Sequence, residues 1–130
     1  IFSIDASIGI VKWKQSVSSS LRPAVIENLI FSVSEQGYFF IIDDKTGNIL
    51  RITNALINIK NKKNNIKPTG FVIARNKIYL SLSNGRLVKI NIGTGLQENI
   101  FKLNGSKISR PYIFNGNMYL IKDNAIIKIN

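Results

Sequence analysis

One phrase recurs along this chain of 130 residues: an apolar strand, an Asp or Asn, a short turn, a Gly and a second strand. The three copies are marked by the pairs Asp5 and Gly9, Asp43 and Gly47, and Asn91 and Gly95. The second Asp follows the first by 38 residues, and Asn91 follows Asp43 by 48. Periods of this size are typical of repeat architectures, whose short units bury their apolar faces only against neighbouring units. The phrase therefore predicts a fold built from repeated small sheets.

Strand signals dominate the rest of the sequence. Short β-branched and aromatic runs are separated by Gly, Asn, Asp and Pro, and no apolar stripe keeps a helical period over three turns. Turns such as Ser83-Asn84-Gly85 contain the residues that reach the positive φ values of tight hairpins. We expect strands at 1–5, 10–15, 22–26, 29–34, 38–43, 48–53, 69–74, 77–82, 86–91, 96–103, 110–114, 117–121 and 125–129.

Two further phrases repeat with the same period. Asn28–Val33 resembles Asn76–Ser81 and Asn117–Leu120, and Arg22-Pro23 resembles Arg110-Pro111, with Lys67-Pro68 as a looser relative. Each unit then holds four antiparallel strands in about 40 residues, which is the pattern of a β-propeller blade. We expect an all-β propeller segment with a blade end at 1–15, a blade at 16–53, a blade at 54–103 and a last blade at 104–130 that lacks its fourth strand.

Two segments add detail to this division. Tyr38–Ile42 and Ala125–Ile129 are apolar on both faces, which predicts sheets covered on both sides. Residues 54–67 form a basic insertion that accounts for the longer second period. The insertion is interpreted either as a basic loop that contacts a partner or as a tolerated surface loop.

Composition excludes several kinds of chemistry. The chain has no Cys and no His, so disulfides, thiolate catalysis and zinc held by Cys or His are excluded within it. The net charge of +11 suggests either a polyanionic partner or compositional drift. The scattered positions of the Lys residues favour drift. Most aromatic residues lie in apolar strand phrases and not beside basic runs, so we expect no nucleic-acid partner. No apolar run is long enough to cross a bilayer as a helix.

The first copy of the phrase, Ser3–Trp13, resembles the tryptophan-docking motif of quinoprotein-like propellers. Its Asp caps the turn, its Gly takes the left-handed conformation, and its Trp wedges between blades while the indole N–H finds an acceptor. Arg51 and Asn99 replace the Trp in the later copies, and Asn91 replaces the Asp. The blade-turn and docking residues are interpreted as Asp5, Gly9, Trp13, Asp43, Gly47, Asn91 and Gly95.

The final segment, Tyr119–Asn130, resembles the C-terminus of the BamB family, the propeller lipoproteins of the outer-membrane β-barrel assembly machinery. This resemblance implies an arc of about three blades of an eight-bladed ring, closed by a strand from the N-terminus of the same chain. It also implies a non-catalytic scaffold in the periplasm of a Gram-negative bacterium, held at the outer membrane by a lipid anchor outside this segment. The implied partners are the barrel-assembly subunit and unfolded outer-membrane proteins, bound through a strand added to a sheet edge. No partner-binding residue is assigned.

Two alternatives remain open: a fragment of a dehydrogenase that uses pyrroloquinoline quinone, or a generic propeller interaction module. Such dehydrogenases hold calcium with a Glu, Asn and Asp cluster and use a catalytic Asp. Here Asp5 and Asp43 belong to blade turns, and the other acids show no cluster that would converge on a cation. Those acids are Asp44, Asp123, Glu27, Glu35 and Glu98. We therefore expect no catalytic, metal or cofactor residue. Arg22 and Arg110 are interpreted as facing either a central channel or solvent.

Overall fold

The computed structural model describes residues 1–59, 65–103 and 106–129. These ranges contain thirteen β-strands, all in antiparallel sheets, which confirms the predicted all-β fold of four-stranded blades. The described residues form no helix, and so none long and apolar enough to span a membrane. The chain divides into two compact units, Ile1–Asn54 and Ala55–Asn130.

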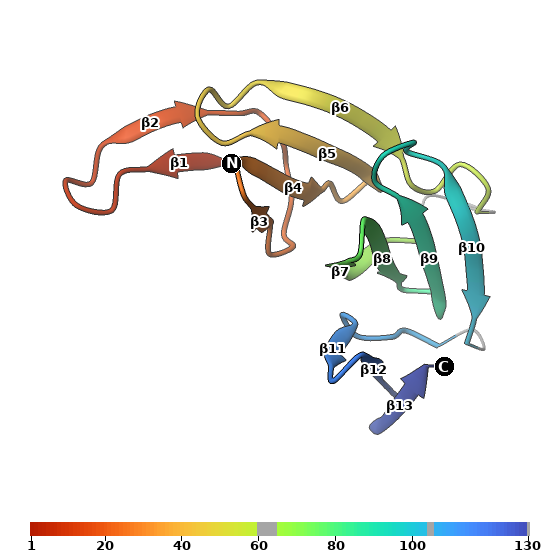
Figure 1. Cartoon of the computed structure of the whole chain (residues 1–130). Coiled ribbons are helices and arrows are strands. Elements are labelled where there is room, and N and C mark those ends of the chain that lie inside the picture. Colours follow the sequence, from red (N-terminus) through yellow and green to blue (C-terminus); the bar gives the residue numbers. More distant parts are fainter. Residues whose placement is uncertain (60–64, 104–105, 130) are drawn as a thin grey trace. The chain divides into compact units, whose positions relative to one another are not determined.

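The first unit holds two sheets (Figure 1). The first sheet pairs β1 (Phe2–Ile4) with β2 (Val11–Lys14). The second sheet has the order β3-β4-β5-β6, a simple meander. Its strands are β3 (Ala24–Ile26), β4 (Leu29–Val33), β5 (Tyr38–Asp43) and β6 (Ile49–Asn54).

The second unit also holds two antiparallel sheets (Figure 1). The third sheet contains β7 (Pro68–Ala74), β8 (Lys77–Leu82), β9 (Arg86–Asn91) and β10 (Gln97–Lys102). The fourth sheet contains β11 (Tyr112–Phe114), β12 (Asn117–Lys122) and β13 (Ala125–Ile129). Each sheet joins consecutive strands through short turns, as expected for blades.

Strand register decides which apolar side chains enter a core. Successive side chains of a strand point to opposite faces of the sheet, so one strand contributes to two layers. In the first unit, the buried side chains of Val17, Ile30 and Ile42 form one cluster. In the second unit, Leu87, Ile108 and Leu120 form another, which joins the third sheet to the fourth. The cores therefore lie between sheets.

The expectation that both doubly apolar strands are covered on both faces is correct for only one of them. In β5, Phe39 and Ile41 lie on one face and Ile42 lies on the other, and all three are buried. In β13, by contrast, Ile126 is 77% exposed. The outer face of the fourth sheet is therefore apolar but uncovered in the part of the chain that the structure describes.

The basic insertion is buried near its start. Ala55 and Leu56 are buried, and the Gln97 side chain donates a hydrogen bond to the Ala55 carbonyl over 2.7 Å. The Asn58 amide also donates to the Gln97 side-chain oxygen, 2.9 Å away. The start of the insertion is thus attached to β10, and the interpretation of the whole insertion as a surface loop is wrong for these residues. Residues 60–64, which carry most of its Lys residues, lie outside the described residues.

Candidate functional site: the repeated turns and the Trp13 dock

The three repeated turns have the same backbone geometry. The N–H of each Gly donates to the carbonyl of the Asp or Asn four residues earlier, over 2.7 Å at Gly9 and 2.8 Å at Gly47 and Gly95. The three Gly residues have φ values of 72°, 74° and 73°, which a residue with a Cβ adopts only at a cost. The repeat phrase therefore encodes one turn, used three times.

The acidic or amide side chain of each turn accepts hydrogen bonds from the backbone. Asp43 Oδ1 accepts from the N–H groups of Lys45 and Thr46, 2.8 and 2.9 Å away. Asn91 Oδ1 accepts from the Thr94 N–H over 3.0 Å. Asn thus preserves part of the Asp geometry, because only the side-chain oxygen is used.

These hydrogen bonds also lower the pKa values of the two Asp side chains. The backbone N–H of Thr46 contributes most to lowering the pKa of Asp43, and the Ser7 hydroxyl does so for the pKa of Asp5. Hydrogen bonds to the ionised form stabilise the charged carboxylate. Asp5 and Asp43 therefore stay charged as turn caps.

Trp13 of β2 packs on the turn of the second sheet. A Cβ built on Gly47 would lie 2.6 Å from the Trp13 ring, so the ring lies against the glycine with no room for a side chain. The indole N–H donates to the Asp44 carbonyl over 2.6 Å. Gln15, which belongs to no repeated phrase of the sequence, donates from its side chain to the Gly47 carbonyl over 2.8 Å. We call these residues, Trp13, Gln15, Asp44 and Gly47, the Trp13 dock.

Gly9 occupies the corresponding turn of the first sheet but has no such neighbour. A Cβ on Gly9 would meet no atom of the described residues within 4 Å. The two glycines share their backbone conformation, but only Gly47 also makes room for a ring. A glycine in this phrase therefore serves the turn alone at one position and both the turn and the dock at the other.

A second close contact joins the third and fourth sheets. A Cβ on Gly70 would lie 2.5 Å from Arg110 Cβ, and the Thr69 hydroxyl donates to the Ile108 carbonyl over 2.8 Å. Arg110 is half-buried, and its buried Nε has no hydrogen-bond partner among the described residues, whereas Arg22 is exposed. The two Arg-Pro positions, equivalent in sequence, are thus in different environments.

The remaining acids that show contacts lie beside cations. Glu98 forms ion pairs with Lys77 and, over 3.5 Å, with Lys89, and Lys77 contributes most to lowering the pKa of Glu98. Asp123 pairs with Lys122 over 2.9 Å, which lowers the Asp123 pKa. Within the described ranges, no three acidic residues gather in a group suited to a metal ion.

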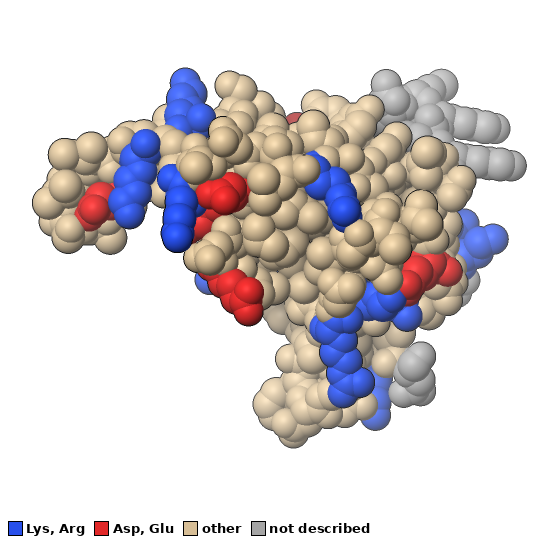
Figure 2. Space-filling model, turned by 45° about the horizontal axis from the view of Figure 1, so that its top comes forward, with Lys and Arg blue, Asp and Glu red and all other residues tan. Residues whose placement is uncertain are grey.

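Basic side chains are spread over the face of the described residues that Figure 2 shows. Figure 2 shows most Lys and Arg residues of this face as separate side chains, several of them beside an acidic residue. A nucleic-acid groove instead needs a continuous basic track with exposed aromatic rings. The part of the described surface that this view shows presents no such track.

Sequence comparisons identify no relative: no family model matches the chain, and no curated protein matches it either. Solved structures do resemble it. BamB from Moraxella catarrhalis aligns over 98% of this chain with a TM-score of 0.67 and 12% identity. A quinohemoprotein alcohol dehydrogenase from Pseudomonas putida HK5 aligns over 83% with a TM-score of 0.61 and 15% identity. The WD40 propeller domain of Doa1 aligns over 82% with a TM-score of 0.64 and 15% identity.

The chain spans 39% of the BamB chain, 17% of the dehydrogenase chain and 34% of the Doa1 chain. At these identities the likeness establishes the fold alone. Together with the four-stranded sheets and the three repeated turns, it shows that this chain has the fold of a β-propeller segment, of the kind found in BamB and the quinoprotein dehydrogenases.

Proposed function

We propose that this chain is a non-catalytic, protein-binding propeller segment whose partners belong to the machinery that assembles outer-membrane β-barrel proteins. Its place is the periplasmic side of the outer membrane. The observation that carries this choice is the extent of the structural likeness to BamB, which covers 98% of the chain, against 83% for the alcohol dehydrogenase. The choice rests on analogy of fold, and its test is therefore functional.

The use of the carboxylates supports a role without catalysis. Asp5 and Asp43 cap turns, while Glu98 and Asp123 are paired with Lys residues. A general acid or base needs a pKa near the working pH, and all four pKa values are lowered instead. These four acids therefore have structural roles, as turn caps or as partners in ion pairs.

The sheet edges supply a means of binding proteins. β6 is an edge strand of the second sheet, and its Leu50 and Ile52 are 57% and 54% exposed. An extended segment of a client adds to such an edge through main-chain hydrogen bonds, and apolar side chains such as these supply further contacts. The edge strand β10 of the third sheet presents Glu98, Asn99 and Lys102 instead, which are residues that discourage strand addition. The β6 edge is therefore the proposed client-binding edge.

Binding at the β6 edge is tested in the full-length protein with a synthetic peptide copied from a transmembrane β-strand. The variant Ile52→Lys should weaken binding, measured by fluorescence anisotropy, about tenfold, because a charge on an edge strand opposes pairing. The matched control is Asn99→Lys on β10, which should leave the affinity unchanged. Equal affinity for the Ile52→Lys variant and the unaltered protein would contradict the proposed edge.

The wider role is tested in the cell. The tagged full-length protein should co-purify with the barrel-inserting subunit after crosslinking, whether or not the β6 edge carries the charge. The quinone alternative is tested separately by adding pyrroloquinoline quinone and calcium to the purified protein. Alcohol oxidation that depends on both would overturn the non-catalytic proposal.

A further inference from the structure

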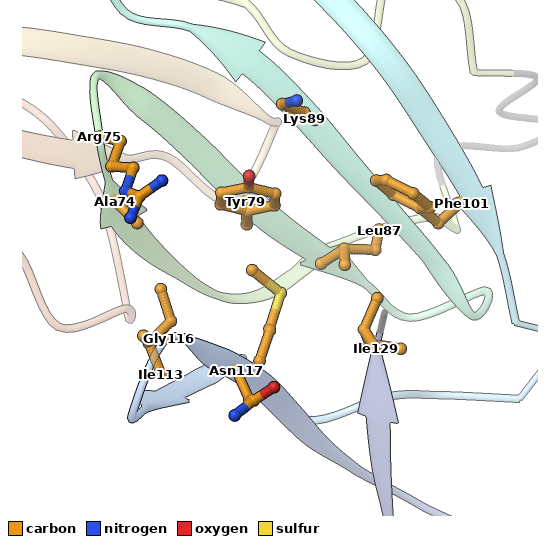
Figure 3. Close-up of a pocket in the computed structure, with 11 residues that line it drawn as sticks. Ala74, Arg75, Tyr79, Leu87, Lys89, Phe101, Ile113, Gly116, Asn117 and Ile129 are labelled. Atoms are coloured by element: carbon orange, nitrogen blue, oxygen red, sulfur yellow. The ribbon is translucent and has the colours of Figure 1, made fainter.

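A cavity of about 420 Å³ lies between the third and fourth sheets, both in the second unit (Figure 3). Its volume falls in the range of about 300–1,000 Å³ that is usual for small-molecule sites. One wall is formed by the end of β7 and by β8, β9 and β10, and the opposite wall by β11, β12 and β13. The cavity is distinct from the β6 edge, which belongs to the first unit, so the two proposals stand independently.

The walls of the cavity are mostly apolar. Tyr79, Leu87 and Phe101 come from the third sheet, and Met118 and Ile129 come from the fourth. Figure 3 shows the Tyr79 and Phe101 rings on the third-sheet side, with Ile129 across from them. Two aromatic rings and a methionine favour a flat apolar body, since rings stack and a thioether adapts its shape.

Among the described residues, two cations also line the cavity, and no acidic residue does. Lys89 and Lys77 both pair with the Glu98 carboxylate, so one negative charge is shared by two positive charges. Arg75 is exposed, and none of the ion pairs among the described residues involves it. In Figure 3, Arg75 and Lys89 lie on opposite sides of the Tyr79 ring. The cavity thus carries positive charge that its own residues do not neutralise.

The position of Arg75 in the chain adds a second observation. It begins the turn between β7 and β8 with φ 48°, a left-handed conformation that Asn adopts far more readily than a long basic residue. At the equivalent turn of the fourth sheet the residue is Asn115, also with φ 48°. The third sheet thus has an Arg, in an unfavourable conformation, at the turn that borders the cavity.

We propose that this cavity binds a small aromatic carboxylate. The ring of the ligand lies between the aromatic wall of the third sheet and Met118, and its carboxylate is held by Arg75, while Lys89 adds positive charge on the other side of the Tyr79 ring. An Arg guanidinium is suited to this role because it donates two parallel hydrogen bonds to a carboxylate. Charge and shape thus select the same class of ligand.

The test is fluorine NMR on the full-length protein with para-trifluoromethylbenzoate, and with the neutral para-trifluoromethylbenzamide as the matched ligand. The benzoate should bind at least tenfold more tightly than the amide. Arg75→Asn keeps a residue suited to the turn and removes the charge, so it should weaken benzoate binding about tenfold without changing amide binding. Met118→Trp, which fills the space, should abolish binding of both.

A control variant is provided by the repeat itself. Lys89 pairs with Tyr79 across β8 and β9, and Lys128 pairs with Tyr119 across β12 and β13, so Lys128 is the same position in the fourth sheet. Lys89→Gln should weaken benzoate binding and Lys128→Gln should not. Equal loss in both variants, equal affinity for benzoate and amide, or no binding to the unaltered protein would each overturn the proposal.

Discussion

The first and second sheets are held together by different contacts from those that hold the third and fourth sheets together. In the first unit, the Trp13 ring lies on Gly47 and its N–H is bound by the Asp44 carbonyl. In the second unit, an aliphatic cluster around Leu120 joins the sheets, and Thr69 and Gly70 add close contacts. Asn99, at the repeat position of Trp13, offers no ring for a dock.

This difference shows that a repeat can keep the same turn while the contact between neighbouring sheets changes. The turn depends on neighbouring residues within one phrase, so it survives the change from Asp43 to Asn91. The contact between sheets depends on residues tens of positions apart, and aliphatic burial replaces a ring on a glycine there.

The largest effect is expected in the aliphatic junction. Leu120→Ala should lower the free energy of unfolding by about 3–4 kcal/mol, because Leu120 is 1% exposed and truncation leaves a cavity. Ile126→Ala, on the uncovered face of the same sheet, should change it by less than about 0.5 kcal/mol. Urea unfolding of the full-length protein measures both. Similar losses for the two variants would mean that another surface covers Ile126.

The next effect separates the Trp13 dock from its turn. Gly47→Ala should cost about 3 kcal/mol, since it strains a left-handed residue and pushes a methyl group into the Trp13 ring. Gly9→Ala carries the same backbone strain with open space around it, so it should cost only about 1 kcal/mol. The difference, measured by urea unfolding, is the contribution of close packing at the dock. Equal costs would show that the ring does not depend on the missing Cβ.

A smaller effect isolates the indole hydrogen bond. Trp13→Phe keeps an aromatic ring on Gly47 but removes the N–H that the Asp44 carbonyl accepts. We expect a loss of about 1.5 kcal/mol, the sum of one hydrogen bond and imperfect packing. Amide exchange in the turn between β5 and β6 should speed up accordingly, while exchange in β8 and β9 should not change.

The smallest effect concerns pH. The pKa of Asp43 lies below its ordinary value of 3.8, so the stabilisation from this group is complete above that value and is lost as pH falls through the lowered pKa. The amide NMR signals of Lys45 and Thr46 should therefore titrate with a midpoint below 3.8, and the Thr94 signal, bound to Asn91, should stay constant. In Asp43→Asn the first two signals should also become constant. A midpoint above 3.8 would contradict the turn-cap role.

Much of the fold was predictable because it is encoded locally. The strands expected at 77–82 and 86–91 are observed as Lys77–Leu82 and Arg86–Asn91. The strand expected at 110–114 is shorter, Tyr112–Phe114, because Pro111 has no N–H to donate to a ladder. The Ile121 N–H donates to the Ser109 hydroxyl instead, over 2.8 Å.

The cavity was not predictable for the opposite reason. No short phrase places Arg75 near Lys89, or Phe101 near Ile129, since these residues meet only when two sheets stack. The single available signal was Arg75 itself, a long basic residue at a turn position that favours Asn or Gly. That signal marks the turn as unusual but does not reveal what lies beside it.

The sequence by itself determined the strands, the repeated turn and its period, because hydrogen bonds between residues a few positions apart and strict side-chain alternation depend on local order alone. The tertiary structure decided which faces are covered. Leu87 and Ile126 occupy equivalent register positions, opposite Ser81 and Ile121, yet Leu87 is fully buried and Ile126 is 77% exposed. Burial is a property of what stacks against a face, and an apolar pattern within one strand carries no information about that neighbour.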